Sequence, residues 1–274
     1  MTSGRHTMST EFLVCGDRRL FTLELRPYAV PACGAVLFLP PFAEEMNKSR
    51  RTVAVQARAL AAAGYCVTLL DPSGCGDSSG NFREATWEHW KADVNCAIAH
   101  LTSRSGLPVT LWGLRLGALL GCEIAAARSD IHSLLLWQPV LNGEQHIDQF
   151  LRFELAGQAL KGTGGFDRAG LWNELRSGRE LAVAGYDLSS QLALEISHSR
   201  LADLGPGCPV SWLDVARPPA QEPSTASANV IGKWRENGMP VSWACVEGEA
   251  FWRNADAPDS PVLISATLAA LSGP

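Results

Sequence analysis

The sequence predicts an α/β protein in which a mostly parallel sheet is covered by helices on both faces. Apolar runs of strand length alternate with segments of helical spacing through the first half of the chain, which is the pattern of successive parallel crossovers. Some of these runs, such as residues 34–39, are almost continuously apolar, as expected for strands buried on both faces.

The expected elements follow one another in a regular order. Glycine and turn-forming residues separate them, as in the loop at 71–80. Strands are predicted at 20–26, 34–39, 65–70, 108–112, 132–137, 210–215 and 241–247, and helices at 49–63, 86–102, 117–127 and 226–237. The stretch at 40–51 is predicted to be a polar loop, and the sheet is expected to contain eight strands.

The alternation breaks at 141–209, where 150–160 and 187–196 are predicted to be helical and 179–186 an isolated strand. Because this segment precedes the last two strands, we expect it to lie as a cap over the mouth of the sheet. The 274 residues, of which 46% are hydrophobic, are sufficient for one large core. Residues 1–274 are therefore expected to form a single domain with 141–209 as a cap insertion.

The composition of the chain argues against several classes of binding partner. The formal net charge is −5 without a basic run, so neither nucleic acid nor an anionic membrane surface is an expected partner. The chain has no apolar stretch long enough to span a bilayer and no signal peptide at its start, so a cytoplasmic location is expected. Its eight cysteines show no metal-ligand spacing, so they are expected to be reduced thiols, with neither a metal site nor a cofactor.

A glycine pair at the end of the third crossover strand identifies the type of α/β fold. Residues Gly113 to Gly117 read G-L-R-L-G between a strand and a helix rich in small residues. In the α/β-hydrolase fold, G-x-S-x-G occupies this junction because the sharp turn leaves no room for side chains two residues from the nucleophile. The sequence therefore predicts this fold, with Arg115 at the serine position.

The other two members of a catalytic triad have no counterparts at their expected positions. The stretch after 210–215 lacks a carboxylate, and Asp214 lies within the predicted strand itself. No histidine follows the last strand, where the loop reads VEGEAFW, although this fold places its histidine last in chain order. A relocated triad would need three separate displacements.

Two groups of residues are candidates for function. The ligand-binding candidates lie at the elbow and in the loop after 34–39, which supplies an oxyanion donor in this fold: they are Phe42, Glu44, Glu45, Asn47, Lys48, Arg115 and Leu116. The displaced-nucleophile candidates are Cys75 and, in the same loop, Ser73 and Ser78, although no partner base is evident. Structural turn residues are the simpler interpretation of this second group.

Several segments together resemble the second of the two exosortase A system-associated hydrolases. They are PPFAEEMNKSRR (40–51), LDPSGCGDSSG (70–80), WGLRLGALLG (112–121), QFLRF (149–153), ELAVAGYDLS (180–189) and VEGEAFW (246–252). The resemblance implies a bacterial cytosolic protein encoded among exopolysaccharide and PEP-CTERM protein-sorting genes, beside a companion hydrolase. Because Arg115 replaces the serine, the resemblance transfers the fold and not the reaction.

The favoured hypothesis is an altered α/β-hydrolase that binds an anionic or sugar-containing ligand, or a protein, under the cap. A working ester or thioester hydrolase or acyltransferase that uses Cys75 or a nearby serine is the first alternative. A scaffold that pairs with the companion hydrolase is the second. An arginine at the elbow needs a counter-charge, for which the sequence offers Glu44 or Glu45 on one side and Glu247 or Glu249 on the other.

Overall fold

The centre of the molecule is a sheet of eight strands. The computed structural model describes residues 6–28, 30–161 and 167–272. The strands are β1 (His6–Cys15), β2 (Arg18–Pro27), β3 (Gly34–Leu39), β4 (Tyr65–Leu70), β5 (Val109–Leu114), β6 (Ile131–Trp137), β9 (Val210–Ala216) and β10 (Val241–Glu247). They lie in the order β1-β2-β4-β3-β5-β6-β9-β10, and only β1–β2 and β2–β4 pair antiparallel. The predicted eight-stranded, mostly parallel sheet is confirmed.

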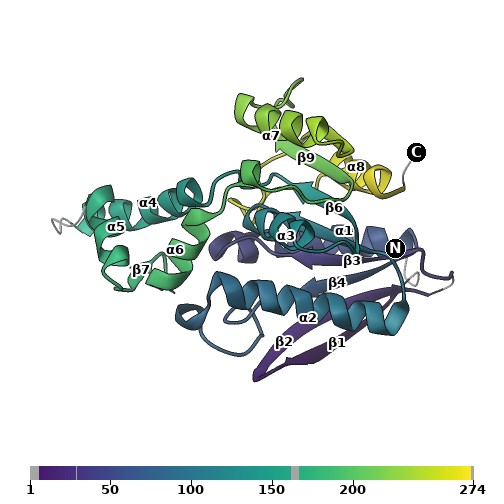
Figure 1. Cartoon of the computed structure of the whole chain (residues 1–274), viewed down its shortest axis with the longest axis horizontal. Helices are drawn as coiled ribbons and strands as arrows, with labels where there is room; N and C mark the ends of the chain where they lie inside the picture. The colour runs from purple at the N-terminus through teal and green to yellow at the C-terminus, as the bar shows by residue number, and fades with distance from the viewer. Residues whose placement is uncertain (1–5, 29, 162–166, 273–274) are drawn as a thin grey trace.

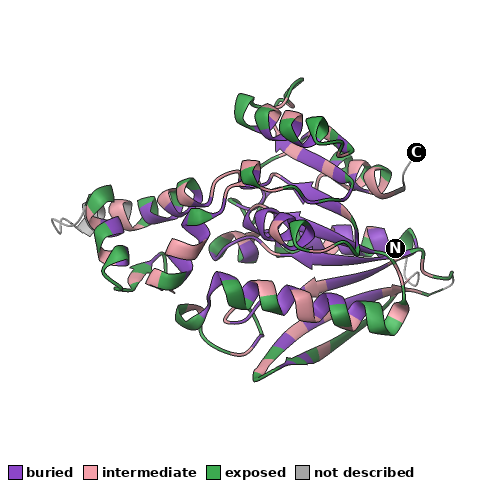
Figure 2. Cartoon of the chain, viewed as in Figure 1, coloured by how far each residue is buried: buried purple, intermediate pink, exposed green. Residues whose placement is uncertain are grey.

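Helices cover both faces of this sheet (Figure 1). Hydrophobic side chains of α1 and α8 pack in one cluster against the sheet, and those of α2, α3 and α7 pack in a second cluster on the opposite face. These helices are α1 (Glu44–Ala62), α2 (Trp87–Ser105), α3 (Leu116–Ala126), α7 (Thr225–Glu236) and α8 (Pro261–Ser272). Figure 2 shows the buried residues gathered in the central strands and on the inward sides of the helices. All residues of β3 and β5 are buried, because helices cover both sides of these strands.

The segment between β6 and β9 lies at the end of the sheet toward which the parallel strands run (Figure 1). It contains α4 (Gly143–Lys161), α5 (Arg168–Arg176), the hairpin of β7 (Leu181–Val183) and β8 (Tyr186–Leu188), and α6 (Ser190–His198). The strand expected at 179–186 is one arm of this hairpin, and the helix expected from 187 begins only after β8. Residues 162–166 of the expected cap lie outside the described residues.

The first part of the chain differs from the sequence-based prediction at two places. No sequence signal indicates strand β1, because most of its residues are exposed and carry no apolar alternation, so only its pairing with β2 defines it. Residues 44–48 are not a loop, since α1 begins at Glu44 after Ala43, which has a φ of 50°. Glu44 and Glu45 occupy its first turn, where the helix dipole favours carboxylates.

A disulfide joins the edge hairpin to helix α2. Cys15 of β1 and Cys96 of α2 are bonded, with their Cα atoms 6.2 Å apart. The expectation of reduced thiols is therefore wrong for this pair. The sequence gives no hint of the pair because 81 residues separate its two members.

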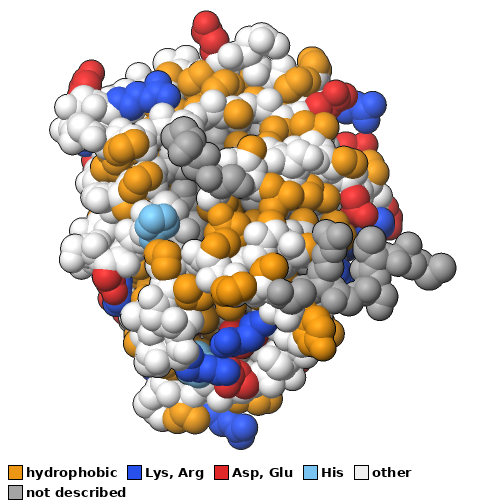
Figure 3. All heavy atoms as spheres, turned by 90° about the vertical axis from the view of Figure 1, so that its right-hand side faces the viewer, with side chains coloured by type: hydrophobic (Ala, Val, Ile, Leu, Met, Phe, Trp, Pro, Cys, Tyr) orange, Lys and Arg blue, Asp and Glu red, His pale blue; other side chains and the backbone are white. Residues whose placement is uncertain are grey.

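An open groove lies at the opposite end of the sheet from the inserted helices. It is lined by the first residues of β3, β5, β6, β9 and β10 and by the last turns of α8, and no Asp, Glu, Lys or Arg of the described residues lines it. Figure 3 looks onto this end, where hydrophobic side chains are widely spread and charged side chains lie mostly at the margins. Within the described ranges, no helix combines the length and the apolar character needed to cross a membrane.

Candidate functional site

The turn between β5 and α3 has the backbone geometry of a nucleophile elbow. Arg115 precedes the first residue of α3 and has a φ of 56°, which is a strained value for a residue with a side chain. A Cβ on Gly113 would lie 2.4 Å from the Cα of Ala118, and one on Gly117 would lie 2.2 Å from the carbonyl oxygen of Leu39. The two glycines are therefore required by close backbone approach, as the sequence pattern predicts.

The N-termini of two helices lie near the elbow. Leu116 is the first residue of α3, so its N–H has no partner within the helix. Phe42 follows β3, the strand that pairs with β5 in parallel, and α1 begins two residues later. Both helix N-termini thus lie at the same edge of the sheet, where their dipoles favour negative charge.

The Arg115 side chain is paired on one side only. Its Nε donates to Oε1 of Glu45 at 3.3 Å, and its Cζ lies 5.6 Å from the ring centroid of Trp252. Among the described residues, no hydrogen bond joins the terminal nitrogens Nη1 and Nη2 to the protein. The side chain of Arg115 is 11% exposed as a whole, and its terminal nitrogens are not among the buried, unpartnered polar atoms of the described residues, so they reach solvent.

Glu45 is the carboxylate at the centre of this site. Burial is the main influence on its carboxyl and raises its pKa, and the nearby charges of Arg115, Arg253 and Lys48 oppose this rise. Its second oxygen, Oε2, is buried without a hydrogen-bond partner. Of these three cations, only Arg115 lies within ion-pair distance of Glu45. Of the four carboxylates that the sequence offers as partners of Arg115, Glu45 makes the pair.

The remaining candidates have other partners. Tyr186 Oη donates to Oε2 of Glu44 at 3.2 Å and accepts from Nδ2 of Asn47 at 3.0 Å, so these two candidates fasten the β7–β8 hairpin to α1. Burial, followed by the charge of Glu44, raises the pKa of Tyr186 to about 12. Glu247 and Glu249 lie beside Arg217, and neither contacts Arg115.

Sequence reasoning missed His146, which α4 places against Phe42. Its side chain is buried, and neither Nδ1 nor Nε2 has a hydrogen-bond partner. Its ring meets that of Phe42 edge-on, with centroids 5.7 Å apart. Burial and, secondarily, the charge of Arg115 lower the pKa of His146 to about 3, so the imidazole is neutral at physiological pH. No sequence pattern indicates this placement, because α4 belongs to the inserted segment.

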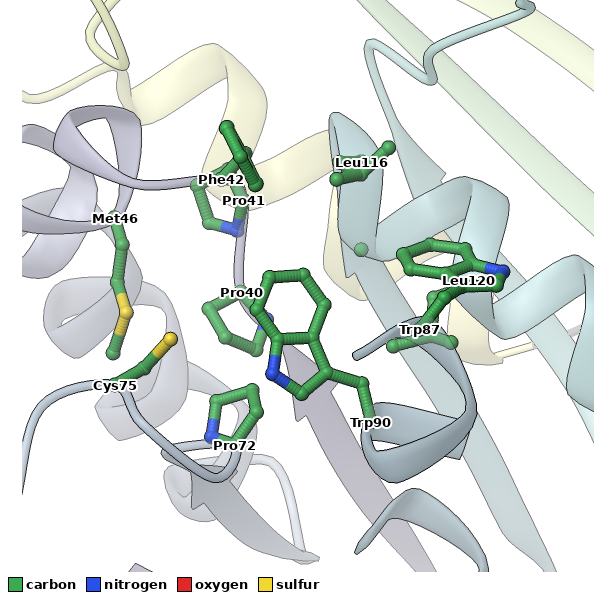
Figure 4. Close-up of a pocket in the computed structure, with 11 residues that line it drawn as sticks. Pro40, Pro41, Phe42, Met46, Pro72, Cys75, Trp87, Trp90, Leu116 and Leu120 are labelled. Atoms are coloured by element: carbon green, nitrogen blue, oxygen red, sulfur yellow. The ribbon is translucent and has the colours of Figure 1, made fainter. Parts of the chain in front are cut away.

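A small apolar cavity adjoins the elbow (Figure 4). Residues that line it include Phe42, Met46 of α1, Leu116 and Gly117 of α3, and Cys75. It has space for about one water molecule. In this conformation the cavity is therefore too small for a ligand larger than water.

Cys75 reaches this cavity but is poorly suited to attack. Burial and the nearby carboxylates of Asp71 and Asp93 raise the pKa of Cys75 to about 12, whereas the thiolate is the reactive form. Ser78 Oγ donates to the carbonyl oxygen of Asp71 at 2.5 Å and accepts from the N–H of Phe21. Ser73 Oγ is buried without a partner. These contacts make Ser78 a structural turn residue.

Structural residues occupy the positions at which the fold carries the acid and the histidine of the triad. Asp214 accepts hydrogen bonds from Nε1 of Trp212 and of Trp243, so its carboxylate supports the packing of β9 and β10. The loop after β10 places Phe251 and Trp252 in the core where the fold carries its histidine. Within the described residues, no group of three His, Cys, Asp or Glu side chains is placed to hold a metal ion.

Comparison with known proteins agrees with this architecture. The family model described as Serine aminopeptidase, S33 matches residues 31–163, a segment that contains the elbow. Est1E from Butyrivibrio proteoclasticus, solved with ferulic acid bound, is 17% identical with a TM-score of 0.68 over 95% of this chain and 97% of its own. No curated protein sequence matches the chain.

Two further solved structures show the same relationship. Alpha/beta hydrolase domain-containing protein 10 from mouse is 17% identical with a TM-score of 0.61, over 96% of this chain and 97% of its own. Proline iminopeptidase from Mycobacterium smegmatis is 16% identical with a TM-score of 0.58, over 96% of this chain and 97% of its own. At these identities the likeness extends to the fold, and the chain is an α/β-hydrolase-fold protein.

Proposed function

We propose that this protein binds an anionic or sugar-containing ligand at its elbow and does not hydrolyse it. One observation carries the proposal. Arg115 occupies the nucleophile position with most of its side chain buried, and in the part of the chain that the structure describes no acceptor bonds the terminal nitrogens of its guanidinium. A protonated guanidinium cannot attack a carbonyl, but it suits a carboxylate or phosphate through two parallel hydrogen bonds.

The surroundings of Arg115 support an anion in this place. The N–H of Leu116 lies at the first residue of α3 and adds a donor on the next residue of the chain. Lys48 and Arg253 add positive charge on the side of Glu45. These features form a site that attracts negative charge and lacks a nucleophile.

The insertion at 141–209 is proposed to act as a cap over this site. Its hairpin is tied to α1 through Tyr186, and its helix α4 contacts Phe42 through His146 and Phe150. Because the cavity beside Phe42 has space for about one water molecule, a larger ligand requires side chains around the elbow to rearrange. The resemblance to exosortase A system-associated hydrolases favours a ligand from exopolysaccharide chemistry, and makes the companion hydrolase a candidate protein partner.

The alternative function is an ester or thioester hydrolase or acyltransferase with Cys75 as nucleophile. Its supporting observation is that Cys75 lines the same cavity as Leu116, the oxyanion donor of the fold. The raised pKa of Cys75 opposes this function, because a thiol that keeps its proton is a weak nucleophile.

Thermal shift measurements on the purified chain test the proposed function. The probes are glucuronate, benzoate, glucose 6-phosphate and inorganic phosphate, added to the wild type, to Arg115→Ala and to Arg217→Ala. Arg217 is the matched control, because it is an exposed arginine paired with Glu247 and Glu249. At least one anion should stabilise the wild type and the control but not Arg115→Ala. Equal shifts in all three proteins would refute an anion site at Arg115.

Covalent labelling distinguishes the alternative. The wild type is incubated separately with a fluorophosphonate and with iodoacetamide, and the modified peptides are mapped. We expect no fluorophosphonate adduct and no preferential alkylation of Cys75 over the exposed Cys33. Rapid, selective alkylation of Cys75, together with esterase activity lost in Cys75→Ala, would establish the enzymatic alternative.

A further inference from the structure

Tyr186 joins the inserted segment to the body of the fold by two hydrogen bonds. Its Oη donates to Oε2 of Glu44 at 3.2 Å and accepts from Nδ2 of Asn47 at 3.0 Å. Both partners lie at the start of α1, and Met46, which lies between them in the sequence, lines the cavity at the elbow. The hydroxyl of Tyr186 therefore bonds the part of α1 that borders this cavity.

The ring of Tyr186 approaches the same cavity through two phenylalanines. It packs edge-on against Phe82 and Phe150, with ring centroids 5.1 Å and 6.4 Å away. Both of these rings pack in turn against Phe42, which lines the cavity. The ring and the hydroxyl of Tyr186 thus both connect the hairpin to the wall of the cavity.

The hairpin that carries Tyr186 is a small element whose position depends on its side chains. Strands β7 and β8 have three residues each and form a separate two-stranded sheet. Ala184 and Gly185, which join them, both have positive φ, as in a tight two-residue turn. Strand β7 packs on α4 and α5, whereas β8 lies beside the short 3₁₀ helix η1 (Phe82–Glu84). Because an isolated hairpin is only marginally stable, contacts such as those of Tyr186 determine where it lies.

A second polar contact joins the hairpin to the body but is the weaker of the two. Asp187 accepts a hydrogen bond from Arg83 of η1, and these side chains are 45% and 54% exposed. Ion pairs exposed to this degree contribute little, because water screens them and two side chains must be ordered. Tyr186 is only partly exposed, and one net hydrogen bond changes an equilibrium constant about fivefold. The hydroxyl of Tyr186 is therefore the stronger of the two contacts.

We propose that Tyr186 is a latch residue, whose hydroxyl holds the β7–β8 hairpin on α1 and whose release lets the hairpin move and opens the elbow cavity. This inference rests on the proposed function, because it supplies the rearrangement that a ligand larger than water requires at the elbow. A ligand of this size binds only the open fraction of molecules, so the latch lowers its apparent affinity. Tyr186 thereby regulates access to Arg115.

Alkylation of Cys75 measures the opening without any ligand. Its side chain lines the cavity beside Met46 (Figure 4) and is only partly exposed. The wild type, Tyr186→Phe and Tyr65→Phe are incubated with iodoacetamide, and the rate at Cys75 is followed by peptide mapping. Tyr65→Phe is the matched control, because it removes a hydrogen bond of 2.7 Å to the carbonyl oxygen of Leu271, beside the groove at the opposite end of the sheet.

The latch predicts different rates in the two variants. Tyr186→Phe should raise the rate at Cys75 about fivefold, because it keeps the ring contacts and removes only the hydroxyl. Tyr65→Phe should leave the rate unchanged. An unchanged rate in Tyr186→Phe, or an equal increase in Tyr65→Phe, would overturn the proposal. A larger increase in Asp187→Asn than in Tyr186→Phe would also overturn it, because the ion pair would then hold the hairpin.

Binding to the elbow supplies a second measurement, made by isothermal titration calorimetry on the full chain. The probes are glucuronate, benzoate, glucose 6-phosphate and inorganic phosphate. Any probe that binds the wild type should bind Tyr186→Phe more tightly, by up to about fivefold, because more of the variant is open. Equal or weaker binding to the variant would overturn the role of the latch at the elbow. If no probe binds the wild type, the proposed function fails, whereas the alkylation rates still decide whether Tyr186 holds the hairpin.

Discussion

Replacing His146 with phenylalanine should change how the stability of the protein depends on pH. Burial first, and the charge of Arg115 second, lower the pKa of His146 to about 3 in the folded protein, against about 6.5 in an unfolded chain. As pH falls below 6.5, the unfolded chain takes up a proton that the folded protein cannot accommodate. The folded state therefore loses stability progressively between about pH 6.5 and pH 3.

The size of the effect follows from these two pKa values. Linkage gives a loss of about 2 kcal/mol between pH 7 and pH 5 from this one side chain, if the pKa of His146 in the folded state is near 3. The raised pKa of Glu45 acts in the opposite direction, because a carboxyl with a raised pKa stabilises the fold at low pH. Comparison of the wild type with His146→Phe removes contributions that the two proteins share.

Urea unfolding at pH 7 and at pH 5 measures the difference. The wild type should lose about 2 kcal/mol more than His146→Phe over this interval. His89→Phe, the control at an exposed histidine of α2, should show the pH dependence of the wild type. Parallel pH dependence in the wild type and His146→Phe would refute the reasoning. It would mean that the imidazole accepts a proton in the folded protein and is therefore open to water.

Three further predictions concern the backbone and the disulfide. Because Arg115 has a φ of 56°, Arg115→Gly should be more stable than Arg115→Ala by about 1 kcal/mol in urea unfolding, and the reverse order would contradict strain at the elbow. Gly117→Ala should cost more than about 3 kcal/mol, since its Cβ would lie 2.2 Å from a carbonyl oxygen. The control Gly232→Ala, with open space at its Cβ, should gain about 0.5–1 kcal/mol, so equal effects would refute the close approach. Replacing Cys15 and Cys96 with alanine should cost about 2–4 kcal/mol, and an unchanged midpoint would mean that their bond does not form.

The sequence predicts the sheet well because its signals are local. Strands β3, β4 and β10 occur at the predicted residues, and β5 agrees closely, since each is an apolar run bounded by glycine, proline or polar residues. The two glycines of the elbow are predictable for the same reason, because their spacing records how closely the backbones approach. Helix α1 is misjudged at its start because charged residues in a first turn resemble a solvated loop.

The site is harder to predict because its members come from distant parts of the chain. Arg115 and Glu45 are recognisable, since the fold fixes their positions at one edge of the sheet. His146 is not, because it belongs to the inserted segment, whose packing on Phe42 follows no periodic rule. The sequence indicates only that Trp252 stands where the fold carries a histidine; it does not predict that Trp252 packs beside Arg115.

The strained turn at Arg115 has a consequence for protein engineering. The positive φ is imposed by the close packing of Gly113 and Gly117 and not by the chemistry of the residue between them, since it is present without a serine. Any side chain installed at this position should therefore project from the same Cα in the same direction. A series of substitutions at position 115 would therefore place side chains of different chemistry on the same backbone geometry, without redesign of the surrounding fold.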